Sequence, residues 1–136
     1  MFDATSKSAI EYARENRLEE WVHEFLCGEG NNKGFSDGLK LTEREFTAPA
    51  LMKLDQFTRI HGPEEGMIYR AVGEEHIGYF WDKIKKIEER YAAGDWDMPP
   101  LIIQHSDGVY ELNDGNHRFE ALKNLGVSEY WVILWK

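Results

Sequence analysis

The sequence is poor in cysteine, in long apolar runs and in positive charge, and each shortage excludes a class of protein. A single cysteine, Cys27, excludes an intramolecular disulfide and a metal cluster built on thiolates. No run of about 18 apolar residues is present, so no membrane-spanning helix is expected. The first residues also lack the basic and then apolar order of a signal peptide. We therefore expect a cytoplasmic protein that does not associate with a membrane.

Basic residues are outnumbered by acidic ones. The chain carries 16 lysines and arginines against 25 aspartates and glutamates, a formal net charge of −9. Non-specific binding to nucleic acid depends on basic side chains that displace counterions from the phosphate backbone. We therefore expect no non-specific nucleic acid binding. An anionic ligand would have to be held by a focused site and not by the overall field.

Helices are predicted where apolar residues recur at intervals of three and four. The three segments with this spacing are residues 6–27, 79–93 and 116–125. Asn16 is expected to break the first of them into two helices, and Thr5 or Ser6 is expected to be its N-cap. The length of 136 residues suits a single domain with one core.

The glycine-rich segment that follows residues 6–27 is expected to be irregular. Residues 27–38 contain four glycines and predict a loop, with Cys27 packed as a small apolar side chain at its start.

Strands are predicted in the last third of the chain. Residues 101–105 and 109–113 flank the sequence Ser-Asp-Gly, which is typical of a tight hairpin turn. A final strand is expected at residues 130–135. Together with the helices, this order predicts an α+β fold with a small mixed sheet flanked by helices.

The sequence ELNDGNHRFEALKNLG, residues 111–126, passes from a predicted strand into a predicted helix. The first turn of a helix carries unpaired amide groups and the positive end of the helix dipole. Gly115 would let a ligand approach this backbone, and His117 and Arg118 would add side-chain donors. These features predict a small anion site, most naturally for phosphate.

A purely structural explanation of the same residues is about equally good. Asp114 or Asn116 would cap the helix, Gly115 would serve the turn, and Arg118 would pair with an acid. One glycine before a helix is a weak signal by itself. In the functional interpretation Asp114 would instead be a ligand of Mg²⁺ or a catalytic carboxylate.

The segment DGNHRFEALKNLG resembles the Gly-x-x-Arg signature of the ParB/sulfiredoxin superfamily. The surrounding order is also similar to that family: a charged helix, a Pro-Pro strand at residues 99–103, a hairpin at 107–112 and a last strand at 130–135. The resemblance covers residues 79–135. It implies a ParB-like core at about residues 46–136 of a single domain, with residues 1–45 as an N-terminal helical extension. A weaker resemblance links that extension to stand-alone ParB-like domains of some bacteria.

The resemblance implies a nucleotide-binding function. Members of the superfamily bind nucleotides, and the signature segment contacts phosphates. By that resemblance Gly115, Asn116, His117 and Arg118 would contact the phosphates of a nucleoside di- or triphosphate, and any Mg²⁺ would be held by Asp114, Glu64 or Glu65. Some stand-alone relatives phosphorylate small molecules such as free serine, which makes an ATP-, ADP- or CTP-dependent phosphotransferase or an NTPase an open possibility.

Three departures from the family limit what is carried over. Asn116 stands where sulfiredoxins have their reactive cysteine, so sulfinic acid reduction is not expected. The chain has no room for the helix-turn-helix of partitioning proteins, so sequence-specific DNA binding is not expected either. The sequence contains no recognisable nuclease motif, so nuclease activity ranks last among the candidate functions.

Two acids between glycines are further candidates. Glu64 or Glu65 would be a general base or a Mg²⁺ ligand if residues 61–66 fold over the anion site. A solvated acidic turn is the commoner outcome for such residues.

A different class of function also stays open. In it the domain is catalytically silent and binds a protein partner through its acidic surface and aromatic edges.

Overall fold

The computed structural model describes residues 2–70 and 72–136. Three helices form the N-terminal part: α1 (Ser6–Arg14), α2 (Leu18–Cys27) and α3 (Lys33–Leu39). The predicted break is confirmed, because Asn16 has a φ of 62° between α1 and α2. Thr5 is the N-cap of α1, and its side chain accepts a hydrogen bond from the amide of Ser8 at 3.1 Å.

The prediction of a loop over residues 27–38 is wrong for its second half, which forms α3. Glycine disfavours helix, but tertiary burial outweighs that preference here. Ser36 and Leu39 are buried, and the ring of Phe35 lies 5.9 Å from that of Trp135. The packing predicted for Cys27 is also wrong, since this residue is exposed at the end of α2.

A four-stranded mixed sheet forms the centre of the domain. Its strands are β1 (Ala50–Lys53), β4 (Leu101–Ser106), β5 (Val109–Asp114) and β6 (Glu129–Trp135), in the order β1-β6-β4-β5. The pair β4–β6 is parallel, and the pairs β1–β6 and β4–β5 are antiparallel. The predicted hairpin is confirmed, with Asp107 and Gly108 both at positive φ, as a two-residue turn of the primed type requires.

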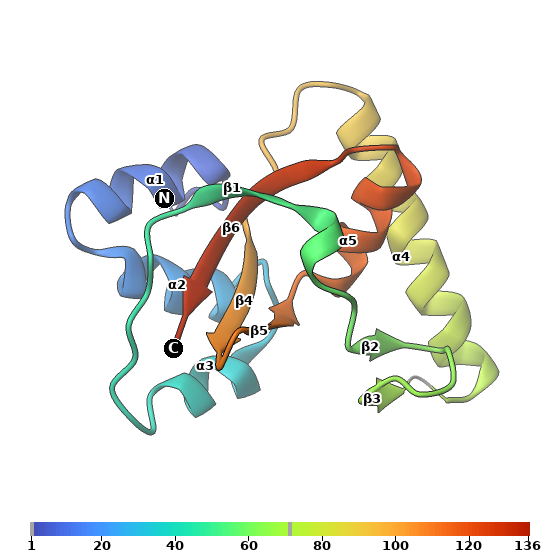
Figure 1. Ribbon diagram of the computed structural model, residues 1–136. Coiled ribbons are helices and arrows are strands. Elements are labelled where there is room, and N and C mark those ends of the chain that lie inside the picture. Colours follow the sequence, from blue (N-terminus) through green and yellow to red (C-terminus); the bar gives the residue numbers. More distant parts are fainter. Residues whose placement is uncertain (1, 71) are drawn as a thin grey trace.

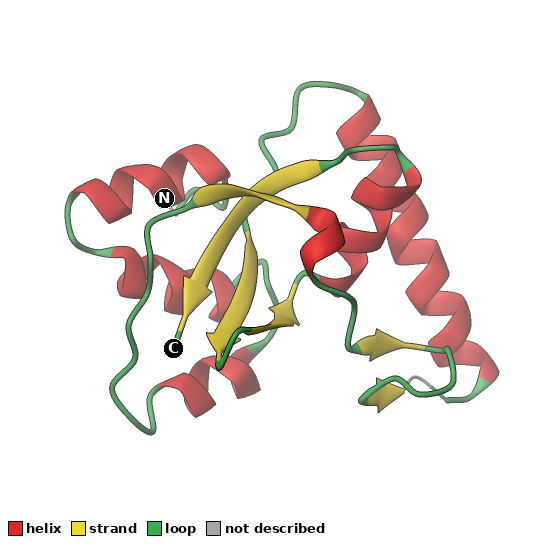
Figure 2. Cartoon of the chain, in the orientation of Figure 1, coloured by secondary structure: helices red, strands yellow, loops and turns green. Residues whose placement is uncertain are grey.

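The remaining elements lie on one side of this sheet. They are the 3₁₀ helix η1 (Leu54–Gln56), a parallel ribbon of β2 (His61–Gly62) and β3 (Tyr69–Arg70), and the helices α4 (Glu74–Ala92) and α5 (Asn116–Asn124). Figure 1 shows α1 to α3 on one side of the sheet and α4 and α5 on the other. The fold is therefore α+β, with a small mixed sheet flanked by helices (Figure 2).

The core is divided by the sheet into two layers. Alternate residues of a strand point to opposite faces, so Ile102 packs with Trp21 of α2 while Leu101 and Ile103 pack with Phe119 of α5. This arrangement places β5, an edge strand, and the start of α5 between the two helical layers. None of the helices in the described ranges combines the length and apolar character needed to cross a bilayer.

Candidate functional site

A cleft of about 720 Å³ opens at the junction of β5 and α5. Its walls come from both helical layers: the end of α2 and the segment that leads into α3 on one side, and β2, β3 and α4 on the other. Its volume falls in the range of small-molecule sites, roughly 300–1,000 Å³. The residues predicted from sequence at this junction, from Asp114 to Arg118, all line the cleft.

Gly115 sets the geometry of the junction. Its φ of 107° lies in the left-handed region, and an added Cβ would come within 2.6 Å of Leu101 Cδ2. The chain can therefore turn from β5 into α5 only with glycine here. The first helical hydrogen bond runs from Phe119 N to Gly115 O at 2.7 Å, and no side chain caps the helix. Within the described residues the amides of positions 116 to 118 consequently have no hydrogen-bond acceptor in the protein.

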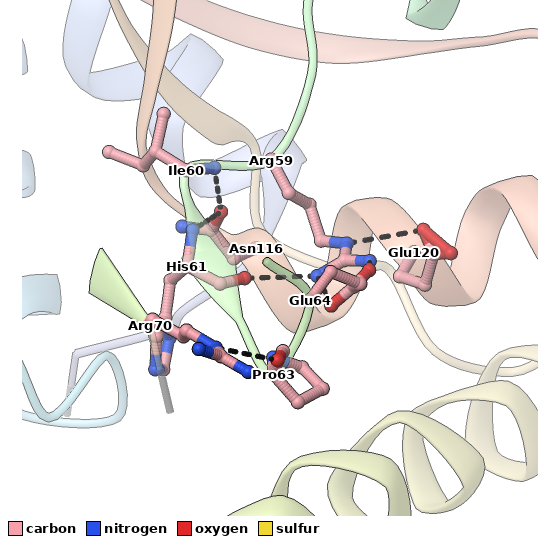
Figure 3. A network of polar contacts seen from close by, with 8 residues as sticks. All are labelled: Arg59, Ile60, His61, Pro63, Glu64, Arg70, Asn116 and Glu120. Atoms are coloured by element: carbon pink, nitrogen blue, oxygen red, sulfur yellow. Dashed lines mark hydrogen bonds and ion pairs between the residues drawn. The ribbon is translucent and has the colours of Figure 1, made fainter. Parts of the chain in front are cut away.

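The side-chain NH₂ group of Asn116 is a further hydrogen-bond donor beside these backbone amides. Its Oδ1 accepts hydrogen bonds from the amides of Ile60 at 2.9 Å and His61 at 3.1 Å (Figure 3). Two N–H donors converging on one atom assign it as the carboxamide oxygen, so the NH₂ group points the other way. The residue is 7% exposed and lines the cleft. In the described part of the chain no acceptor bonds this NH₂ group, so its two donors are left for a ligand.

Arg118 is a buried anchor. Its Nη1 donates to Pro99 O at 2.7 Å and to Pro100 O at 2.8 Å, and its Nη2 donates to Asp114 Oδ2 at 2.7 Å. These bonds tie α5 to the strand that follows the two prolines. These donors of Arg118, which the sequence assigned to a phosphate, are therefore engaged within the protein.

Asp114 is engaged on both of its oxygens. Oδ2 receives Arg118, and Oδ1 accepts a hydrogen bond from Asn32 Nδ2 at 3.1 Å. No group of three or more potential metal-ligating side chains occurs among the described residues. This donor set does not fit a Mg²⁺ ion held by the protein alone, and we derive no step through such an ion.

Two histidines line the cleft beside the unpaired amides. The rings of His61 and His117 lie 5.7 Å apart at 83°. Burial lowers the pKa of His117 to about 3, and the charge of Lys83 adds to this effect. Burial and then the Arg59 guanidinium lower the pKa of His61. Both imidazoles are therefore neutral at pH 7, and the anion-binding character of the cleft comes from other donors.

The acids Glu64 and Glu65 do not line the cleft. Glu64 forms an ion pair with the buried Arg59, which also contacts Glu120 at 3.3 Å and donates to His61 O at 3.0 Å (Figure 3). The hydrogen bond from Arg59 holds the pKa of Glu64 below its usual range. Glu64 thus secures the segment that carries His61, whereas Glu65 is exposed.

Several residues of the cleft were not predicted from sequence. Lys83 and Arg90 of α4 line it, and neither has a carboxylate within salt-bridge distance among the described residues. Lys83 lies outside the apolar spacing that predicted this helix, and only the placement of α4 reveals that its side chain lines the cleft. Arg90 lies 4.0 Å from the centre of the Trp96 ring. Glu29 and Glu111 also line the cleft, and among the described residues their carboxylates form no hydrogen bond or ion pair.

Comparisons with protein-family models, with curated proteins and with solved structures found no match for the chain. The resemblance to the ParB/sulfiredoxin superfamily therefore stays a prediction that depends on the residues quoted above.

Proposed function

We propose that the chain binds a nucleoside di- or triphosphate, or a phosphorylated small molecule of similar size, in this cleft. The observation that carries the proposal is the Asn116 carboxamide, whose locked oxygen directs two free donors into the cleft beside three unpaired amides. Phosphate oxygens accept hydrogen bonds and carry negative charge, which the positive end of a helix dipole favours. The predicted family resemblance assigns the same segment to phosphate.

The rest of the lining suits a nucleoside. Lys83 supplies a positive charge near His61 and His117, where a second phosphate group would lie. Phe25, Phe35 and Trp96 give the cleft an aromatic lining that favours a base. A ligand of this kind is abundant in the cytoplasm, which is where we place the protein.

In this proposal Arg118 and Asp114 support the site and do not touch the ligand. They fix the start of α5 against the Pro99–Pro100 backbone and against Asn32. Any Mg²⁺ would arrive as the counterion of a triphosphate. Phosphotransfer or hydrolysis would need a carboxylate inside the cleft, and Glu111 and Glu29 meet that requirement, whereas Glu64 and Glu65 do not.

The test is thermal unfolding with ATP, ADP, CTP, GTP and inorganic phosphate, each with and without Mg²⁺. A ligand at a hundred times its dissociation constant stabilises the folded chain by about 2.7 kcal/mol. For a domain of this size that corresponds to a rise in melting temperature of roughly 8 °C. We expect at least one nucleotide to produce such a rise, and phosphate alone to produce a smaller one.

Two variants locate the site. Asn116→Asp keeps an acceptor for the amides of Ile60 and His61 but replaces the two donors by a carboxylate oxygen, so it should fold and lose the ligand-dependent rise. Lys83→Gln should weaken the ligand about tenfold, while Lys86→Gln, on the exposed side of α4, serves as the matched control. No rise with any ligand in a folded sample would end the nucleotide proposal.

A catalytically silent interaction domain is the second candidate, and the engagement of Arg118 favours it. An arginine that is bonded to Asp114 and to two proline carbonyls stabilises the fold with or without a ligand. The same unfolding experiment separates the two candidates, because a silent domain shows no shift with nucleotides.

A further inference from the structure

Two side chains of β5 line the cleft before the chain reaches the β5–α5 junction. They are Glu111 and Asn113, and both are half-buried. Alternate residues of a strand share a face, so the two side chains lie on the same face of β5 with their Cα atoms about 7 Å apart. Gly115, where the unpaired amides begin, follows at about 7 Å from Asn113 along the same strand. One wall of the cleft thus carries both side chains in line with the proposed phosphate site.

The two side chains have opposite hydrogen-bonding character. Asn113 Oδ1 accepts a hydrogen bond from Trp135 Nε1 at 2.8 Å, which assigns this atom as the oxygen and leaves the NH₂ group to donate. Among the described residues nothing accepts from that NH₂ group, and Glu111 forms no hydrogen bond or ion pair. Arg44 lies over the Trp135 ring, 5.1 Å from its centre, but does not line the cleft. The wall therefore offers a free donor and a carboxylate that only accepts.

One aromatic ring of the cleft is well placed to stack on a base. Phe25 is only 2% exposed, and Arg90 already lies over the Trp96 ring at 4.0 Å. Phe35 is half-buried, and among the described residues its one aromatic contact is a tilted one with Trp135 at 5.9 Å. The same indole bonds the β5 amide, so a base stacked on Phe35 would have its edge beside that amide.

The charges of the cleft orient a nucleotide along this wall. Lys83 lies near His61 and His117, where its charge attracts phosphate groups. The free carboxylate of Glu111 repels phosphate groups. The phosphates are therefore favoured at the start of α5, and the uncharged base is favoured at Glu111 and Asn113.

We infer that Glu111 and Asn113 select guanine as the base. The Watson–Crick edge of guanine has an acceptor, O6, followed by two donors, N1–H and the N2 amino group. Asn113 donates to O6, and the two oxygens of Glu111 accept from N1 and N2 in a charge-assisted bidentate contact. Adenine, cytosine and uracil each have one donor group on this edge, so the carboxylate finds one partner. The inference rests on the proposed function, and it commits Glu111 to the base, which leaves Glu29 as the cleft carboxylate for any phosphotransfer.

The test is isothermal titration calorimetry of the full chain with GDP, ADP, CDP, UDP and inosine diphosphate. Inosine diphosphate differs from GDP only in lacking the N2 amino group. A bidentate contact to a base discriminates by roughly tenfold or more, so GDP should bind at least tenfold more tightly than ADP, CDP and UDP. Inosine diphosphate loses one charge-assisted hydrogen bond and should bind about tenfold more weakly than GDP.

Two variants test the two side chains separately. Glu111→Gln replaces one acceptor oxygen by an NH₂ group that opposes the guanine amino group, so GDP should weaken at least tenfold and its advantage over inosine diphosphate should disappear. Asn113→Asp keeps an acceptor for Trp135 but turns a carboxylate oxygen towards O6, and should also weaken GDP at least tenfold. Glu129→Gln, at an exposed position of β6 outside the cleft, is the control and should leave the guanine preference unchanged. Circular dichroism should show a native fold in all three.

The outcomes separate this inference from the nucleotide proposal. Similar affinities for all five nucleotides would overturn the guanine inference and leave the nucleotide proposal standing. Binding of none of them to a folded sample would overturn both. An advantage of GDP over inosine diphosphate that survives Glu111→Gln would show that Glu111 does not contact the base, and would overturn the guanine inference alone.

Discussion

At the scale of single residues, Arg118 is the side chain whose role differs most from its sequence-based interpretation. The signature motif assigned it to a ligand, whereas its guanidinium holds Asp114 and two proline carbonyls together. Sequence reasoning did include an internal ion pair among the alternatives. It had no means of choosing, because the choice depends on where residues 99 and 100 lie relative to a helix that begins 16 residues later.

Removing Arg118 should destabilise the fold. In Arg118→Ala the Asp114 carboxylate keeps its burial and loses its charged partner, which costs about 3–5 kcal/mol. Urea unfolding should show this loss, and Arg14→Ala, at the exposed end of α1, should stay within about 0.5 kcal/mol of wild type. A loss below about 1 kcal/mol in Arg118→Ala would mean that the buried network is not holding the junction.

The cleft histidines should make the fold sensitive to acid. The pKa of His117 is about 3 in the folded chain against an ordinary 6.5, so the unfolded chain binds the proton more readily. Stability is therefore full above pH 6.5 and is lost as the pH falls towards 3. Between pH 6.5 and 5 this one group should remove up to about 2 kcal/mol.

Urea unfolding of wild type and His117→Gln at both pH values measures this contribution. The variant should lose less stability than wild type on acidification. An equal loss in both proteins would show that other groups dominate the acid response.

At the scale of elements, α1, α2, α5 and the hairpin were predictable because each depends on a local pattern. The helix predicted from residue 79 is confirmed as α4, but it begins earlier, at Glu74. Asn16, Thr5 and the pair Asp107–Gly108 carry their own turn or cap signals. The helix α3 was missed because its glycines mark a loop locally and only burial of Leu39 and Ser36 against α2 favours helix. The cleft was missed in part because its walls come from elements far apart in sequence.

The junction of β5 and α5 should not tolerate a side chain at position 115. Gly115→Ala adds both a left-handed backbone penalty and a contact with Leu101, and we expect a loss of roughly 2–4 kcal/mol. Gly126→Ala has the same kind of φ, at 78°, with no atom within 4 Å of the added Cβ, and should cost only about 1 kcal/mol. Thermal unfolding of both variants isolates the packing contribution, and equal losses would contradict it.

At the scale of the whole molecule, the sheet depends on both helical layers. Ile102, Ile133 and Trp135 are buried only because α1 to α3 cover that face. Residues 46–136 were predicted as a core with an added extension, but a fragment of these residues would expose this face. We expect the fragment to show no cooperative thermal transition, while the full chain does. A cooperative transition in the fragment would show that the extension is dispensable.

The two hydrogen bonds that converge on Asn116 Oδ1 couple the position of a loop to the polarity of the site. With residues 60 and 61 in place, rotation of the carboxamide is locked and the cleft meets only its donors. Once those two amides move away, the amide plane is free to turn over, and the same side chain accepts hydrogen bonds as readily as it gives them. Movement of this loop would therefore change the selectivity of the cleft as well as its access. The Asn116 carboxamide would no longer prefer acceptors such as phosphate oxygens, and would bind hydrogen-bond donors about as readily.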